Sequence, residues 1–139
     1  MNTYLILAGV LSAIAAVLHV GCIIFGAPWY RFFGAGEKMA LLSERGSIKP
    51  TIITSIITLT LAIWALYAFS AAGLIGQLPF IRTALIMIIL IYCSRGIFGL
   101  FFINNPIGRS PQFWLWSSSV CLLIGAIHLI GLQQQWTSL

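Results

Sequence analysis

Four long apolar runs do most to limit what this chain can fold into. They cover about residues 4–25, 50–73, 79–103 and 111–133. A helix needs about 20 apolar residues to cross a hydrocarbon core of roughly 30 Å. Charged residues make up only 6% of the chain, too few to give a soluble fold a polar surface. The sequence therefore predicts an all-α polytopic membrane protein, a four-transmembrane-helix bundle that forms a single membrane domain over residues 1–139.

Prolines mark where three of these helices should begin. Pro50, Pro79 and Pro111 each stand at the start of an apolar run. Proline at the first helical position loses no helix hydrogen bond and already has a helical φ. We therefore expect the second, third and fourth spans to begin at these residues.

The connection after the first span, residues 26–49, is predicted to be ordered and partly helical. Residues 28–33 form an aromatic cluster suited to the headgroup boundary of a membrane. Gly34-Ala35-Gly36 then interrupts the chain as a hinge. Glu37 to Arg45 has the composition of a short amphipathic helix that lies in the interface. The four-span bundle therefore carries a partly helical interfacial loop between its first two spans.

The formal net charge of +5 is explained by membrane topology and anionic lipid, not by nucleic acid. Basic residues gather at the first and third connections, which lie on one side of the membrane, and the other side holds only Arg82. The five on the richer side are Arg31, Lys38, Arg45, Lys49 and Arg109. Cytoplasmic loops are the ones rich in Lys and Arg. Both termini are therefore predicted to be periplasmic.

Three of the spans carry a stripe of small or polar residues at helix-face spacing. Small faces let membrane helices approach closely, so we expect a compact bundle with these stripes turned inward. In particular, His19, Ser55, Thr58 and Cys121 should face the interior. The stripes are Ala8, Ser12, Ala15, His19 and Cys22 in the first span, Thr51, Ser55, Thr58, Ala62 and Ala65 in the second, and Ser118, Cys121, Gly125 and His128 in the fourth.

Arg95 is the residue that most invites a functional interpretation. A charge inside a span costs several kcal/mol unless it is paired, hydrated or reaches the interface. One reading is a structural arginine that snorkels to the headgroups. The other is an anion contact for a carboxylate, a phosphate or a lipid headgroup, since guanidinium suits all three. Glu37 or Glu44 would be its counter-charge if the loop folds back. The candidate ligand-binding or lipid-binding set is Arg95, His19, Glu37, Glu44 and Arg45.

No metal, cofactor or catalytic group is expected. His19 is able to titrate or to bind metal, but a hydrogen-bonded histidine in a packed helix is the commoner case. Haem held by His19 and His128 is excluded, because their depths differ by about 13 Å at 1.5 Å per residue. There is no CxxC pair and no zinc-type spacing of ligands. The serines at 117–119 lack a base within their span, so they are interpreted as packing residues.

A set of short stretches is spread over nearly the whole chain. They are Phe33-Gly34-Ala35-Gly36-Glu37, Pro50-Thr51, Trp64-Ala65-Leu66-Tyr67-Ala68, Leu78-Pro79, Tyr92-Cys93-Ser94-Arg95-Gly96 and Trp116-Ser117-Ser118. Together they resemble a group of small four-span inner-membrane proteins of Gram-negative bacteria. The resemblance implies a location in the bacterial inner membrane and little about activity.

These observations favour a non-catalytic inner-membrane protein that binds a lipid or a partner and supports the cell envelope. One alternative is a small membrane enzyme or lipid-modifying factor that uses His19, Arg95 and Glu37. Another is a transporter of small anions or amphiphiles. The expected partners are membrane lipids, another inner-membrane or envelope protein, or a second copy of the chain.

Overall fold

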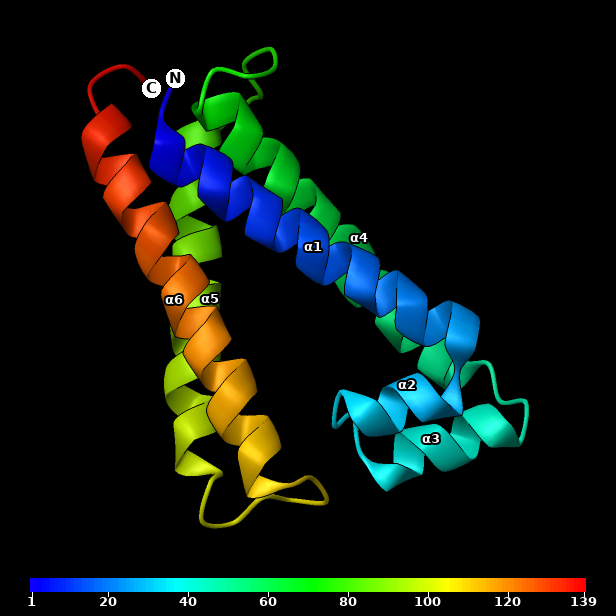
Figure 1. The fold of residues 1–139 in the computed structure, drawn as a ribbon. Helices are drawn as coiled ribbons and strands as arrows, with labels where there is room; N and C mark the ends of the chain where they lie inside the picture. Colours follow the sequence, from blue (N-terminus) through cyan, green and yellow to red (C-terminus); the bar gives the residue numbers. More distant parts are fainter.

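The computed structural model describes residues 1–139 and is entirely helical. Four of its helices are long: α1 (Thr3–Phe25), α4 (Lys49–Ala71), α5 (Ile81–Phe101) and α6 (Pro111–Gln135) (Figure 1). All four are long and apolar enough to cross a membrane. The predicted all-α, four-helix membrane bundle is therefore confirmed, and the chain is a multi-pass membrane protein.

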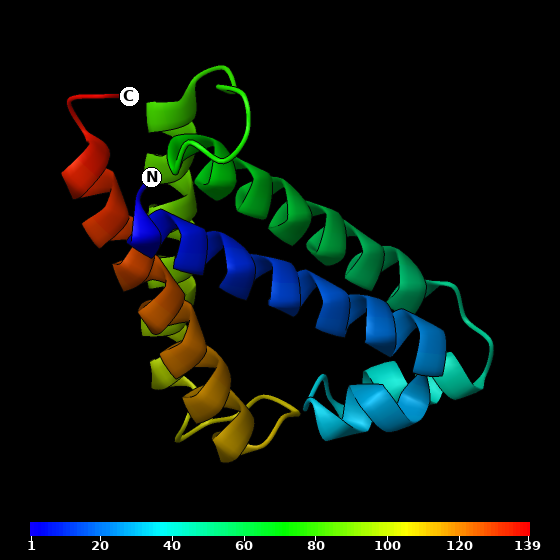
Figure 2. The same cartoon turned by 45° about the horizontal axis from the view of Figure 1, so that its top comes forward.

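The long helices form two antiparallel pairs that meet at one end only. Arm one is α1 packed on α4, and arm two is α5 packed on α6. The arms meet beside the two termini and separate towards the other end, as both views of the ribbon show (Figures 1 and 2). We call the first the closed end. The second, which holds residues 26–48 and 102–110, is the open end.

Small residues and polar pairs hold the closed end together. The side chain of Leu5 is fully buried against Gly131 of α6, where any side chain would collide with it. Asn2 accepts a hydrogen bond from the backbone of Leu5 at 2.9 Å and donates one to Gln134 at 2.8 Å. Ser12 and Tyr92 share a 2.8 Å hydrogen bond that links the two arms. Close helix contact and satisfied polar groups are what a bundle in lipid needs.

The predicted inward stripes are confirmed at most positions in α1 and α6. Ala8, Ser12 and Cys22 are buried on α1, as are Ser118, Gly125 and His128 on α6, whereas Ala15 is half-buried.

The prediction for the second span is wrong at its open end. Ser55 is exposed, and Thr54 is the buried residue of that turn. His19, Thr58 and Cys121 are only half-buried. The physical reason is the divergence of the arms: towards the open end α4 has α1 and the loop beside it but not arm two, so only part of its small-residue face finds a partner. The bundle is compact at the closed end alone.

Proline marks two of the three helix starts. Pro111 is the first residue of α6 and Pro50 the second of α4. The prediction that a helix begins at Pro79 is wrong, since α5 begins two residues later, at Ile81. Phe80 between them has a left-handed φ of 54°, which cannot continue a helix.

At the open end, α2 (Ala27–Phe32) and α3 (Glu37–Glu44) form a short helical hairpin. The helix predicted from Glu37 to Arg45 is confirmed as α3, and its position in the membrane interface stays a prediction. The helix α2 lies where only an aromatic cluster was expected. The turn between them uses Gly34 and Gly36, whose φ values of 75° and 102° favour glycine. The hairpin has a small core of its own, made of Cys22, Ala27, Tyr30 and Ala40.

Candidate anion-binding site at the open end

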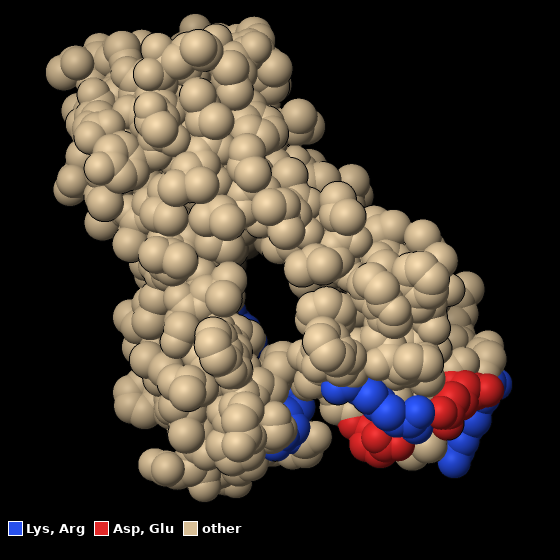
Figure 3. Space-filling model, in the orientation of Figure 1, with Lys and Arg blue, Asp and Glu red and all other residues tan.

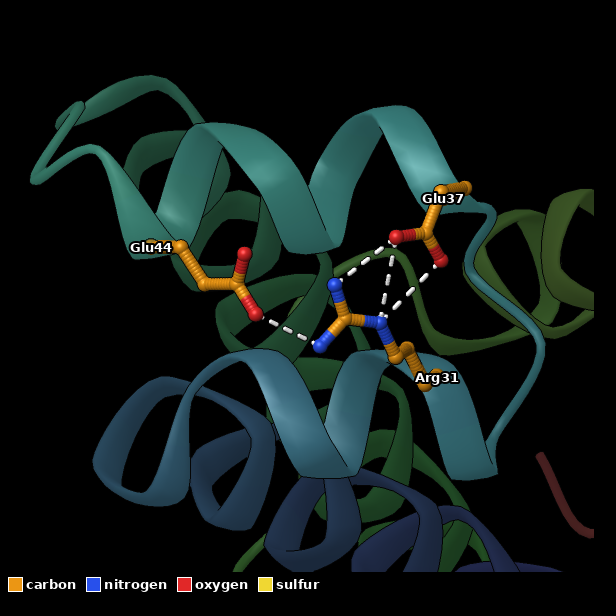
Figure 4. Close-up of polar contacts among 3 residues, drawn as sticks. All are labelled: Arg31, Glu37 and Glu44. Carbon is orange, nitrogen blue, oxygen red and sulfur yellow. Dashed lines mark hydrogen bonds and ion pairs between the residues drawn. The ribbon is translucent and has the colours of Figure 1, made fainter.

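Both acidic residues of the chain lie on the hairpin and bind the same arginine. Arg31 of α2 lies between Glu37 and Glu44 of α3, with its Nη2 2.7 Å from Glu37 Oε1 and its Nη1 2.6 Å from Glu44 Oε1 (Figure 4). Hydrogen bonds to Glu37 and Glu44 raise the pKa of Arg31. The Arg31 hydrogen bond in turn lowers the pKa of Glu37. The cluster is exposed, so its role is to join α2 to α3 locally.

This pairing leaves the rest of the chain without a free carboxylate. The sequence contains only two Asp or Glu residues, and both contact Arg31. The interpretation in which Glu37 or Glu44 folds back to neutralise Arg95 therefore does not describe this structure. Any counter-charge for the other arginines must come from another molecule.

Arg95 lies inside a span and is held without a counter-ion. It is six residues before the end of α5, which is about 9 Å along the helix at 1.5 Å per residue. Its Nη2 donates to Ser117 Oγ at 3.1 Å, and its guanidinium carbon is 5.1 Å from the centre of the Trp114 ring. Its Nη1 is buried and has no hydrogen-bond partner. An unpartnered guanidinium nitrogen in a membrane span is costly.

A glycine makes room for this arrangement. A side chain at Gly99 would collide with Arg95 Nη1 and with the Ser118 hydroxyl. The Ser118 hydroxyl is also buried without a partner. Two buried polar atoms without hydrogen-bond partners, one from α5 and one from α6, thus lie over the same glycine.

Arg109 brings a second guanidinium to the same tryptophan. Its guanidinium carbon lies 5.4 Å from the Trp114 ring centre and 4.9 Å from that of Phe113. Burial lowers the pKa of Arg109, and the positive charge of Arg95 lowers that pKa further. The indole itself is fixed, because Trp114 Nε1 donates to the Pro106 carbonyl at 2.7 Å. We call Arg95, Arg109 and Trp114 the arginine cluster.

The arginine cluster also contacts the hairpin of arm one. Arg109 Nε donates to the Ala35 carbonyl at 3.2 Å. Gly34 lies so close to Phe113 that a side chain there would collide with the ring. The α2–α3 turn is thus where the hairpin reaches arm two.

An opening lies between the arms above this contact. Figure 3 shows it passing between arm one and arm two, with basic atoms on the side of arm two. Arm two has Arg82 at the closed end, so the basic residues that it offers at the open end are Arg95 and Arg109. The opening is thus bounded by apolar helices and has basic groups on one side.

The remaining candidates from the sequence lie apart from the arginine cluster. His19 is on α1, which packs on α4 and not on α5, and its Nδ1 donates to the Ala15 carbonyl at 2.7 Å. Arg45 is exposed at the end of α3 without an ion pair. His128 is fully buried on α6, with Nδ1 2.9 Å from the Ile124 carbonyl. The structure therefore separates the predicted set into the hairpin ion pairs and Arg95.

Three functional candidates were not predicted. Arg31 and Arg109 were used only to predict the orientation in the membrane, and Trp114 was given no role. A signal for Trp114 does exist, because it precedes Ser117 and Ser118 by one helical turn and so shares their face. No pattern in the sequence indicates that Arg109 turns back over that ring.

Comparison with known proteins adds no relative: no family model matches the chain, and no curated protein or solved structure matches it either. The resemblance to small four-span inner-membrane proteins therefore stays a prediction, and function has to be argued from the arginine cluster itself.

Proposed function

We propose that this protein binds a membrane lipid with an anionic headgroup, which lies at the arginine cluster, and that it does so without catalysing a reaction. One observation carries the proposal. Arg95 and Arg109 lie against the same tryptophan, and both carboxylate side chains of the chain are paired with Arg31 instead. Guanidinium binds phosphate and carboxylate through paired, charge-assisted hydrogen bonds.

The surroundings favour a lipid as the source of that anion. Arg95 lies about one and a half turns inside α5, where a headgroup and its first chain carbons meet. The opening between the arms lies among membrane-spanning helices, so in a bilayer acyl chains are the natural material to fill it. A lipid seated there would have its charged end at the arginine cluster and its chains between the arms.

The proposed setting is the inner membrane of a bacterium, with both termini periplasmic and the open end cytoplasmic. Arg95 lies inside a span, so six Lys and Arg residues bear on topology. Five of these six lie at the open end, which supports this orientation. In this setting the protein would support the cell envelope through its lipid, alone or with another envelope protein.

Native mass spectrometry of gently purified protein tests lipid binding. Wild-type protein should retain an anionic lipid, and Arg95→Leu should lower that retention about tenfold or more, the loss expected for one charge-assisted contact. Arg82→Leu is the matched control, because Arg82 also stacks on a tryptophan, Trp136, but at the closed end. The proposal fails if Arg95→Leu retains as much lipid as Arg82→Leu.

Arg95→Lys separates the charge from the shape of the contact. Lysine keeps the positive charge but lacks the planar fork that binds two oxygens. Retention should therefore fall with Arg95→Lys as well, though less than with Arg95→Leu. Full retention with lysine would mean that charge alone holds the lipid.

Fusions at the C-terminus test the orientation. Alkaline phosphatase should be active there, and a fluorescent protein that folds only in the cytoplasm should be dark. The reverse pattern would place the arginine cluster at the periplasmic face and reject the proposed orientation.

A further inference from the structure

We infer that the anion at the arginine cluster is a phosphate monoester, which carries two negative charges, and not a singly charged phosphodiester. This inference rests on the proposed function, since it names the chemical class of the lipid headgroup. It follows from the charge and the free hydrogen-bond donors of the site.

Two unpaired guanidinium groups need two negative charges to neutralise them. Arg95 and Arg109 each have a guanidinium carbon within 5.4 Å of the same indole centre, and neither has an ion pair. Arg109 contacts a neutral carbonyl, and Arg95 contacts a neutral hydroxyl. A phosphate monoester carries about 1.5 to 2 negative charges at pH 7, whereas a phosphodiester carries one.

The free donors also match three terminal oxygens. Arg95 Nη1 has no partner, and Arg109 uses only its Nε, so both of its terminal nitrogens remain available. The Ser118 hydroxyl, which lies with Arg95 Nη1 over Gly99, is a further unsatisfied group. A monoester offers three terminal oxygens to these donors, and a diester offers two.

The experiment compares two lipids of equal chain length and one soluble anion. Purified protein in mild detergent receives dioleoyl phosphatidic acid, a monoester, or dioleoyl phosphatidylglycerol, a diester, and bound lipid is counted by native mass spectrometry. Wild-type protein should prefer phosphatidic acid about tenfold, the factor that one additional charge-assisted hydrogen bond supplies. Inorganic phosphate is added as a competitor to distinguish a lipid from a free phosphate.

Arg109→Leu tests the cause of the preference. With one guanidinium left, the second charge of the monoester has no partner, so the ratio between the two lipids should fall towards one. Arg82→Leu, with the same loss of charge at the closed end, should leave the ratio unchanged. A ratio that survives Arg109→Leu would overturn the inference.

The outcomes separate this inference from the proposed function. Equal retention of the two lipids, with both lost in Arg95→Leu, rejects the monoester and leaves anionic lipid binding in place. Retention of neither lipid rejects both. Displacement of phosphatidic acid by an equal concentration of inorganic phosphate supports the monoester class but rejects the lipid as its source.

Discussion

The two ends of this molecule differ in how their buried polar groups are paired. At the closed end, Asn2 is bound to Gln134 and Ser12 to Tyr92, and the one buried side-chain atom without a partner is Nε2 of His128, whose ring lies 5.5 Å from that of Tyr92. At the open end, Arg95 Nη1 and the Ser118 hydroxyl are buried and unpartnered. The two ends also differ in their cations. At the closed end one arginine, Arg82, lies over Trp136, whereas at the open end both Arg95 and Arg109 lie over Trp114.

If the proposed function is right, this difference separates the end that stabilises the fold from the end that binds lipid. Paired polar groups between tightly packed helices stabilise a single arrangement. Unpaired ones cost free energy, and they persist in a native structure where another molecule completes them or where neighbouring residues impose them. Substitutions at the closed end should therefore lower stability, and substitutions at the open end should change binding.

The largest effect is expected from Gly131→Leu at the closed end. The new side chain would collide with Leu5, which is fully buried and has no space to move into, so α1 and α6 must separate. Overpacking of this kind costs about 1–3 kcal/mol of unfolding free energy, which unfolding in detergent would measure. Gly76→Leu is the control, because nothing lies near that glycine. Equal loss in both variants would show that the closed end is not the tighter one.

A smaller loss is expected from Tyr92→Phe. This change removes the hydroxyl that binds Ser12 and leaves a buried serine unpaired between the arms. Interhelical hydrogen bonds in membranes contribute about 0.6 to 1 kcal/mol, so the free energy of unfolding in detergent should decrease by that amount. Tyr67→Phe serves as the control, since the Tyr67 hydroxyl is exposed and binds a loop carbonyl. If Tyr67→Phe costs as much, the Ser12 contact has no special part in joining the arms.

Arg95→Leu should leave the unfolding free energy within about 0.5 kcal/mol of wild type, although we expect it to lower lipid retention about tenfold or more. The lost contacts with Ser117 and Trp114 are offset because an unneutralised charge no longer lies within the span. A loss of more than about 2 kcal/mol, together with wild-type behaviour of Arg95→Lys, would instead make the arginine a structural pin.

The smallest effect concerns the hairpin at low pH. The pKa of Glu37 is lowered in the folded hairpin by Arg31, so the ion pair stabilises the hairpin above the ordinary carboxyl pKa of 4.5. That contribution is lost as the pH falls from there through the folded pKa. A spin label at Lys38→Cys, in protein whose native cysteines are replaced, should become more mobile over this range.

Salt and a second variant sharpen the pH measurement. Both glutamates are exposed, so high salt at neutral pH should loosen the hairpin in the same direction. Glu37→Gln should remove most of the pH dependence. A label at Gln77→Cys, at the closed end, should report no change, and a matching change there would remove the contrast between the ends.

Much of the fold was predictable because it depends on apolar length. Each of the four spans begins and ends within two residues of its predicted bounds, and α5 begins two residues late because Phe80 adopts a left-handed φ that no pattern indicates. The inward position of Ser55 was predicted wrongly for a different reason. A small-residue stripe shows that a helix can be approached closely, but not that a partner lies beside it at that depth.

The candidate site was predictable only in part. Arg95 could be singled out because a charge within a span is unusual. Its neighbours depend on irregular backbone: Ile107 and Gly108 have φ values of 44° and 73°, and they reverse the chain so that Arg109 returns over Trp114. The pairing of Glu37 with Arg31 could not be predicted either, because Arg31 lies on α2, a six-residue helix that the aromatic sequence does not indicate.

The position of Asn2 has a consequence for the order in which the protein is made. Its side chain binds Gln134, and its backbone nitrogen lies 3.4 Å from the carbonyl oxygen of Ala72, so a residue that precedes the first span contacts one at the end of the fourth. Arm one can form once α4 has been synthesised, but its closed end must wait in the membrane until α6 has followed. Ser12 lacks its partner Tyr92 until α5 has been made, and Asn2 lacks its partner Gln134 until α6 has been made, so both polar side chains face lipid or the insertion machinery in the meantime.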